Sequence, residues 1–161
     1  MDSKAQKKLS EFFTRVNHLY SDIELWLKTE QFIIKKEKIE ISEKIAGSYK
    51  IESLIVLDNE NNKIAELRPV GAWIIAAEGR VDIIGKLNKE NLVYLISEGP
   101  HLTIIEEAKN SKTAKSSRPL FRGIEGNGWY WIESKRPGRA RLLDKNLFID
   151  LMSMVSDYEF V

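Results

Sequence analysis

The spacing of apolar residues changes twice along this chain, and that change constrains the fold more than any other feature. Between residues 4 and 29 apolar side chains recur every three or four positions, which predicts a long amphipathic helix. From residue 33 to 143, residues 109–127 excepted, the pattern changes to alternation between turn-forming clusters, which predicts antiparallel strands. Helical spacing returns after Asp144, a favourable N-cap. The order helix, meander, helix predicts the α+β class.

Length and composition fit one domain of this class. The chain has 161 residues, 43% of them hydrophobic, which is enough for one ordinary core. We therefore expect a single α+β domain over residues 1–161, built on a strongly twisted meander of roughly seven to nine strands. Such a sheet either stays open or curls into a barrel, and the sequence allows both. Ser3 and Gln6 form a capping-box pattern at the start of the first helix.

One expected hairpin carries more apolar residues than a single buried face needs. The pattern predicts strands at 73–77 and 80–84, joined by a tight turn at residues 78–79. Three arrangements would cover the additional apolar residues: helices on both faces of the sheet, closure of the sheet into a barrel, or a second protein chain. Three residues of the less apolar face are candidate partner-binding residues: Trp73, Ile75 and Ile84, which share that face with Arg80 and Asp82.

A second expected hairpin combines aromatic and basic residues. The pattern predicts strands at 129–134 and 139–143 around a Pro-Gly turn. In the expected register Trp129 and Trp131 share a face with Ala140 and Leu142, which predicts a core position for both tryptophans. The opposite face would hold Tyr130, Arg139, Arg141 and Leu143. Tyrosine beside arginine suits contact with phosphates and stacking on a base, so Tyr130, Arg139 and Arg141 are candidate binding residues.

The net charge of +1 hides a basic segment. Residues 109–141 hold nine basic and two acidic side chains, whereas the segments before and after it are each net negative by three. Residues 109–127 show no regular period, which predicts a basic, flexible loop. Arg118 and Arg122 of this loop join the candidate binding residues. The segment could bind nucleic acid or another phosphorylated ligand.

The sequence offers no catalytic or metal-binding constellation. It has no cysteine and only two histidines, which removes disulfides and thiolate chemistry and argues against a multi-histidine metal site. No phosphate-binding loop, metalloprotease motif or nucleophile elbow is present, so we expect no metal, no cofactor and no catalytic residue, and a non-enzyme. The longest apolar stretch, residues 72–77, is too short to span a membrane. With no signal peptide and no cysteine, we expect a cytoplasmic protein without a membrane partner.

Three functions remain open on these grounds. The leading interpretation is a non-enzymatic binding or regulatory module that acts through protein–protein contacts, self-association included. The first alternative is binding of nucleic acid or a phospholigand through residues 109–141. The second alternative is a small-ligand carrier, or an enzyme, with a barrel-like cavity.

Overall fold

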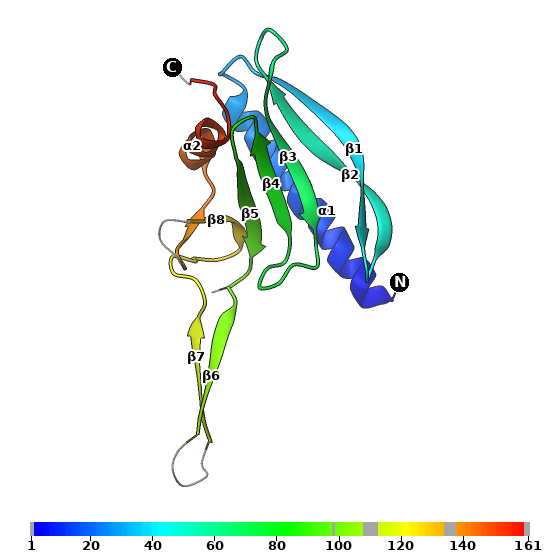
Figure 1. The fold of residues 1–161 in the computed structure, drawn as a ribbon. Coiled ribbons are helices and arrows are strands. Elements are labelled where there is room, and N and C mark those ends of the chain that lie inside the picture. Colours follow the sequence, from blue (N-terminus) through cyan, green and yellow to red (C-terminus); the bar gives the residue numbers. More distant parts are fainter. Residues whose placement is uncertain (1, 98, 108–112, 134–137, 160–161) are drawn as a thin grey trace.

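The computed structural model describes residues 2–97, 99–107, 113–133 and 138–159, with 102–107 and 113–118 described through their backbone alone (Figure 1). A long helix comes first, strands follow, and a shorter helix comes last, which confirms the predicted α+β class. The helices are α1 (Ser3–Leu27) and α2 (Lys145–Val155). The strands are β1 (Ile33–Glu43), β2 (Gly47–Leu57), β3 (Lys63–Gly71), β4 (Arg80–Gly85), β5 (Lys89–Leu95), β6 (His101–Glu107), β7 (Thr113–Pro119), β8 (Gly128–Ile132) and β9 (Ala140–Leu142).

Seven strands form one antiparallel sheet in the order β1-β2-β3-β4-β5-β8-β9. The strands β6 and β7 pair only with each other, as a two-stranded ribbon that projects away from the main sheet (Figure 1). Over the described residues β1 and β9 do not meet, so the sheet stays open. The barrel alternative is therefore wrong, and this sheet does not enclose the barrel-like cavity that the carrier interpretation needs.

The helix α1 buries the apolar stripe that the sequence predicts, including Phe12, Val16 and Ile23. Its N-cap, however, is Asp2, whose carboxylate accepts the Ala5 N–H at 2.8 Å. The capping box at Ser3 is therefore wrong by one residue. An aspartate at the N-cap supplies both an acceptor and a charge that suits the helix dipole. No helix in the described part of the chain is long and apolar enough to cross a membrane.

Both helices pack on the same side of the main sheet. Side chains of α1 and α2 belong to one core cluster, and the rings of Trp26 and Phe148 lie 5.9 Å apart. The buried Tyr20 fixes α1 to the sheet, because its hydroxyl donates to the carbonyl of Glu52 at 2.6 Å and lies 3.3 Å from that of Leu67. Of the three alternatives for covering the apolar residues of the sheet, the placement of helices on opposite faces is therefore wrong.

The face of the sheet away from the helices carries ion pairs. Asp82 is buried and accepts two hydrogen bonds from Arg80, at 2.8 and 3.1 Å. Lys89 lies 3.8 Å from the same carboxylate, and Arg68 lies 3.6 Å from Glu66 on the neighbouring strand. A carboxylate with two cationic neighbours is electrostatically satisfied, so this face is a structural network of charges.

The prediction of a strand at residues 73–77 is wrong. Residues 72–79 form a loop, and β4 pairs with β3, so that Ile84 lies opposite Glu66. The strand β3 runs past Pro69 to Gly71 with a register shift between these two residues. The pairing of β3 with β2 ends at Leu67, and a proline without an N–H is tolerated where a strand lacks a neighbour on one side.

The expected register of the second hairpin is wrong by one residue. Tyr130 lies opposite Leu142, and Trp131 lies opposite Arg141. Because side chains alternate between faces, this shift moves Tyr130 away from the arginines and sets Trp131 beside Arg141, whose guanidinium lies 5.9 Å from the indole centre. The core position of both tryptophans is confirmed, since each is 7% exposed.

The prediction of a loop without regular structure at residues 109–127 is wrong for residues 113–119. These residues form β7, which pairs with β6 from His101 opposite Pro119 to Glu107 opposite Thr113. The rest of the predicted loop up to residue 112 lies outside the described residues. After β7 the chain returns to the main sheet, where the backbone of Arg122 bridges Arg139 in parallel.

Candidate docking site at the 72–79 loop

The loop of residues 72–79 is fixed at its start by one acidic side chain. The carboxylate of Glu43, the last residue of β1, accepts the N–H groups of Ala72 at 3.1 Å and Trp73 at 3.0 Å. It also accepts the hydroxyl of Tyr49. A carboxylate with three donors holds its neighbours more firmly than neutral hydrogen bonds would. A Cβ on Gly71 would lie too close to the Glu43 carboxylate, so a larger residue here would displace this carboxylate from the loop.

The end of the loop is fixed to β5 and to α1. The Glu78 N–H donates to the Tyr94 carbonyl at 2.8 Å, and the Tyr94 N–H donates to the Gly79 carbonyl at 2.9 Å. A Cβ on Gly79 would lie 2.7 Å from the buried ring of Phe12, so only glycine allows this approach. Ala77 packs against a second core cluster around Leu95. The loop is therefore held at both ends.

The crest of the loop exposes an isoleucine. Ile74 and Ala77 form an isolated bridge that leaves Ile75 and Ala76 at the turn. The side chain of Ile75 is 98% exposed, the highest value among the exposed large hydrophobic residues of the described chain. Ala76 has a φ of 66°, in the left-handed region that a residue with a Cβ seldom adopts. A fixed loop thus presents an uncovered apolar side chain at some cost in backbone strain.

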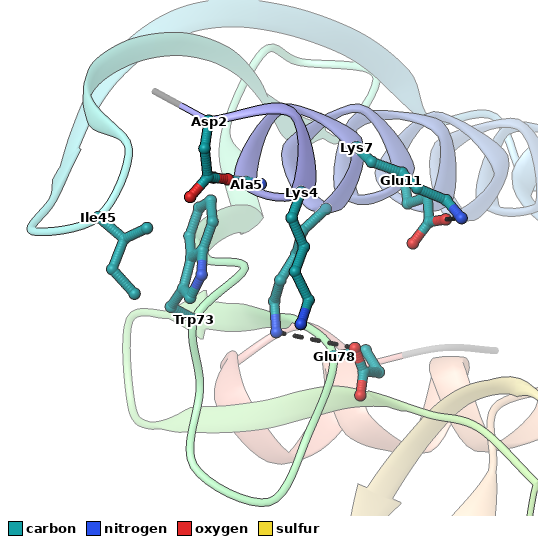
Figure 2. Close-up of a pocket in the computed structure, with 9 residues that line it drawn as sticks. Asp2, Lys4, Ala5, Lys7, Glu11, Ile45, Trp73 and Glu78 are labelled. Atoms are coloured by element: carbon teal, nitrogen blue, oxygen red, sulfur yellow. Dashed lines mark hydrogen bonds and ion pairs between the residues drawn. The ribbon is translucent and has the colours of Figure 1, made fainter.

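A cavity of about 510 Å³ opens on one side of this loop, between it and the first turns of α1 (Figure 2). We call it the Trp73 cavity. Figure 2 shows Lys4 extending from the helix beside the ring of Trp73, with Ile45 of the β1–β2 turn near the same opening. The dashed line to Glu78 in this figure marks the ion pair with Lys8. Lys8 lies 3.7 Å from Glu78 and 5.9 Å from the centre of the Trp73 ring. The complete lining is Asp2, Lys4, Ala5, Lys7, Lys8, Glu11, Ile45, Trp73 and Glu78.

A second cavity, of about 330 Å³, lies on another side of the loop. It is more apolar than the first and is lined by Ala76, Ala77, Glu78, Leu95, Ile96, Gly99 and Pro100. Since Glu78 lines both cavities, the loop forms a ridge between two hollows, with Ile75 at its crest. We call this arrangement the 72–79 ridge.

The chemistry of the ridge favours docking. Its exposed large apolar side chains are Ile75, Ile45, which is 57% exposed, and Ile96, which is 38% exposed. Three lysines line the Trp73 cavity beside them. The three acidic residues of the Trp73 cavity already have partners. Glu78 pairs with Lys8, Glu11 lies within 4.0 Å of Lys7, and Asp2 accepts the Ala5 N–H. Within the described residues, no three histidine or acidic side chains gather as metal ligands. The ridge can therefore offer an apolar anchor and positive charge to a partner.

The structure brings only part of the predicted apolar set together. Trp73 and Ile75 share the 72–79 ridge, whereas Ile84 lies on β4 between Glu66 and Lys89. Three contributing residues, Glu43, Ile45 and Lys8, were not among the residues predicted from the sequence. No local pattern points to them, because they come from three elements that only the folded chain brings to one place.

The predicted basic set separates in a similar way. Arg122 and Arg139 are exposed and adjacent through their backbone bridge, whereas Arg141 is held 3.5 Å from Glu133. Tyr130 is fully buried, and its hydroxyl donates to the Gly126 carbonyl at 2.9 Å, so its ring is not available for stacking. The backbone of Arg118 pairs with Leu102, but its side chain lies outside the described part of the molecule.

Comparison with known proteins finds no matching family model, no similar curated protein and no similar solved structure. Function is therefore inferred from the geometry of the 72–79 ridge.

Proposed function

We propose that the protein is a non-enzymatic binding module that docks a partner protein on the 72–79 ridge. The observation that carries this proposal is the 98% exposure of Ile75 on a loop held at both ends. Burying an isoleucine side chain is worth about 1.5–3 kcal/mol, so a partner that covers Ile75 gains a substantial part of its affinity there. Because the loop is already held, little conformational entropy opposes this gain.

The charges around the ridge point to the chemistry of the partner. Three lysines and three acidic residues line the Trp73 cavity. Lys7 is paired with Glu11 and Lys8 with Glu78, whereas within the described residues Lys4 has no ion pair. A docked carboxylate would complement the Lys4 ammonium group, which raises the association rate and selects the partner. We infer that the partner presents an apolar side chain flanked by acidic residues. A cysteine-free chain suits a reducing compartment, so we propose the cytoplasm as the place of this contact.

A selection experiment tests the proposal even though the partner is unidentified. A displayed library of random short peptides is selected on the purified protein, and bound peptides are measured by fluorescence anisotropy. We expect enriched peptides to combine an apolar residue with Asp or Glu. Ile75→Gln should weaken their binding roughly tenfold or more, because the buried apolar contact is lost. Lys4→Glu should weaken it further through charge repulsion.

The chain offers a matched control for this substitution. Leu25 on α1 is 68% exposed and lies outside the residues that line the ridge. Leu25→Gln should therefore leave peptide binding unchanged. Peptides that bind wild type and Ile75→Gln equally well, or that lack acidic residues, would contradict the proposal.

A second candidate function rests on the exposed arginines of the β9 edge. The bridge between Arg122 and Arg139 sets two exposed cationic residues side by side, which suits a phosphate group. We propose anion binding there as the alternative. It predicts that DNA or RNA binds at low salt and that Arg122→Ala with Arg139→Ala removes this binding. Binding that the double substitution does not change would exclude this site.

A further inference from the structure

The two edges of the main sheet differ in how they are covered. The edge strand β9 has three residues, and the backbone of Arg122 lies beside it: its N–H donates to the Gly138 carbonyl, and its carbonyl accepts the Ala140 N–H at 2.8 Å. The opposite edge strand, β1, has 11 residues and pairs only with β2. Over the described residues its outer edge pairs with no other strand, so a long row of backbone donors and acceptors is available for a further strand.

The charges of β1 are of both signs and are separated along the strand. Edge strands often carry charged side chains, especially lysines, that disfavour pairing with other strands. In β1 the lysines lie toward the start, at 35, 36 and 38, and the glutamates lie at 37, 40 and 43. Antiparallel pairing of two copies of such a strand sets the basic part of one copy against the acidic part of the other.

The pairing geometry narrows the possible registers. A two-fold axis normal to the sheet keeps the two copies on the same face, so each residue of β1 opposes a residue an even number of positions away in the other copy. The residue through which the axis passes opposes its own copy. An axis through residue 35, 36 or 38 therefore sets lysine against lysine, and an axis through residue 37 or 40 sets glutamate against glutamate. An axis through Ile41 sets Lys38 opposite Lys44. With the axis through Ile39, Lys38 opposes Glu40, Lys35 opposes Glu43, and no like charges meet.

We infer that β1 is a self-association edge, on which a second copy of this chain pairs antiparallel about Ile39 to give a continuous sheet across the dimer. Ile39 is partly buried and would contact its own counterpart at the axis, flanked by two Lys38–Glu40 pairs. Opposite charges directly across an antiparallel pair are favourable, and like charges are unfavourable. The inference does not rest on the 72–79 ridge. Glu43 belongs to both surfaces, but its carboxylate is already bound to the loop, and the register is argued from Lys38, Ile39 and Glu40, which do not line the ridge.

Charge reversal tests this register through the mass of the full chain in solution. Wild type should have about twice the monomer mass of 18.6 kDa by light scattering. The substitution Lys38→Glu sets a glutamate opposite Glu40 of the second copy. The substitution Glu40→Lys sets a lysine opposite Lys38 of the second copy. The dimer dissociation constant of each variant alone should therefore rise roughly tenfold or more. An equimolar mixture should restore the dimer, because every pair across the axis is then of opposite charge.

The mixture also controls for effects inside the monomer. Lys38 faces Glu52 and Glu40 faces Lys50 within the β1–β2 hairpin, and these contacts change equally whether a variant is alone or mixed. A monomeric wild type, a dimer that survives both reversals, or a mixture that stays monomeric would each overturn the inference.

A crosslink gives a second measurement that needs no charge change at 38 or 40. The chain has no cysteine, so a single introduced cysteine is the only thiol. Ile39→Cys places two thiols across the axis and should form a disulfide-linked dimer under mild oxidation. Glu37→Cys should crosslink far less, because residue 37 opposes residue 41 of the second copy. Equal crosslinking of the two variants would also overturn the inference.

Discussion

The carboxylate of Glu43 accepts the backbone N–H of Trp73 at 3.0 Å, although the two residues lie 30 positions apart in the chain. This contact joins the end of β1 to the start of the 72–79 ridge. It fixes the backbone from which Ile75 projects, so the ridge depends on an acidic side chain that never touches its crest.

Removal of that carboxylate should loosen the ridge. In Glu43→Ala the N–H groups of Ala72 and Trp73 and the hydroxyl of Tyr49 lose a charged acceptor. We expect a loss of about 2–3 kcal/mol in the free energy of unfolding, measured with urea. Tyr49→Phe removes one donor and should cost about 1 kcal/mol. An unfolding midpoint for Glu43→Ala equal to that of wild type would show that Glu43 does not hold the loop.

Relief of backbone strain at the crest should raise stability. Ala76 has a φ of 66°, which costs a residue with a Cβ but not glycine. Ala76→Gly should therefore increase the free energy of unfolding by up to about 1 kcal/mol, in contrast to the loss that glycine causes at ordinary positions. A clear decrease in stability on this substitution would be inconsistent with the φ at residue 76.

The position of the N-cap of α1 can be measured directly. Asp2 accepts the Ala5 N–H, whereas Ser3 is the first helical residue. Asp2→Ala should cost about 0.5–2 kcal/mol, and Ser3→Ala should change the stability little. If instead Ser3→Ala gave the larger loss, the capping-box prediction from the sequence would be right after all.

A buried tyrosine should make the protein sensitive to alkali. Burial raises the pKa of Tyr20 well above its ordinary value of 10.0, and Glu52 and Glu66 raise it further. The unfolded chain releases this proton near pH 10 while the folded protein retains it, so the stability from this group is complete below that pH and falls above it. The expected slope is up to about 1.4 kcal/mol per pH unit.

The corresponding control is Tyr20→Phe, which has no proton to lose. Its stability should decline less steeply between about pH 9 and about pH 11 than that of wild type, as followed by urea unfolding. Parallel decline of the two proteins would mean that Tyr20 does not cause the loss.

The sequence predicts those elements whose signal is local. Apolar spacing predicted both helices, and Asp144 is the N-cap of α2 as expected, since its carboxylate accepts the Leu147 N–H at 2.8 Å. At α1 the local signal was ambiguous, because Asp2 and Ser3 are both favourable caps. The core position of Trp129 and Trp131 followed from alternation alone.

The failures concern relations between distant segments. The run from Trp73 to Ala77 resembles a buried strand, yet β3 already pairs with β4, and Glu43 holds residues 72 and 73 as a loop. At the second hairpin an error of one residue in register exchanged the β9 residues that share a face with Tyr130 and with Trp131. The structure of residues 73–77 and the register of the second hairpin both depend on pairing with distant strands. A local turn motif does not indicate which strands pair or in which register. The division into a single domain over residues 1–161 stays a prediction.

The most direct test of the docking proposal is a map of backbone amide shifts. An isotope-labelled sample is titrated with a peptide from the selection, and amide resonances are followed by nuclear magnetic resonance. We predict that the largest changes fall in residues 72–79 and at Ile45, with Leu25 unaffected. Changes confined to β8, β9 and the region of Arg122, with residues 72–79 unmoved at saturation, would contradict the proposal.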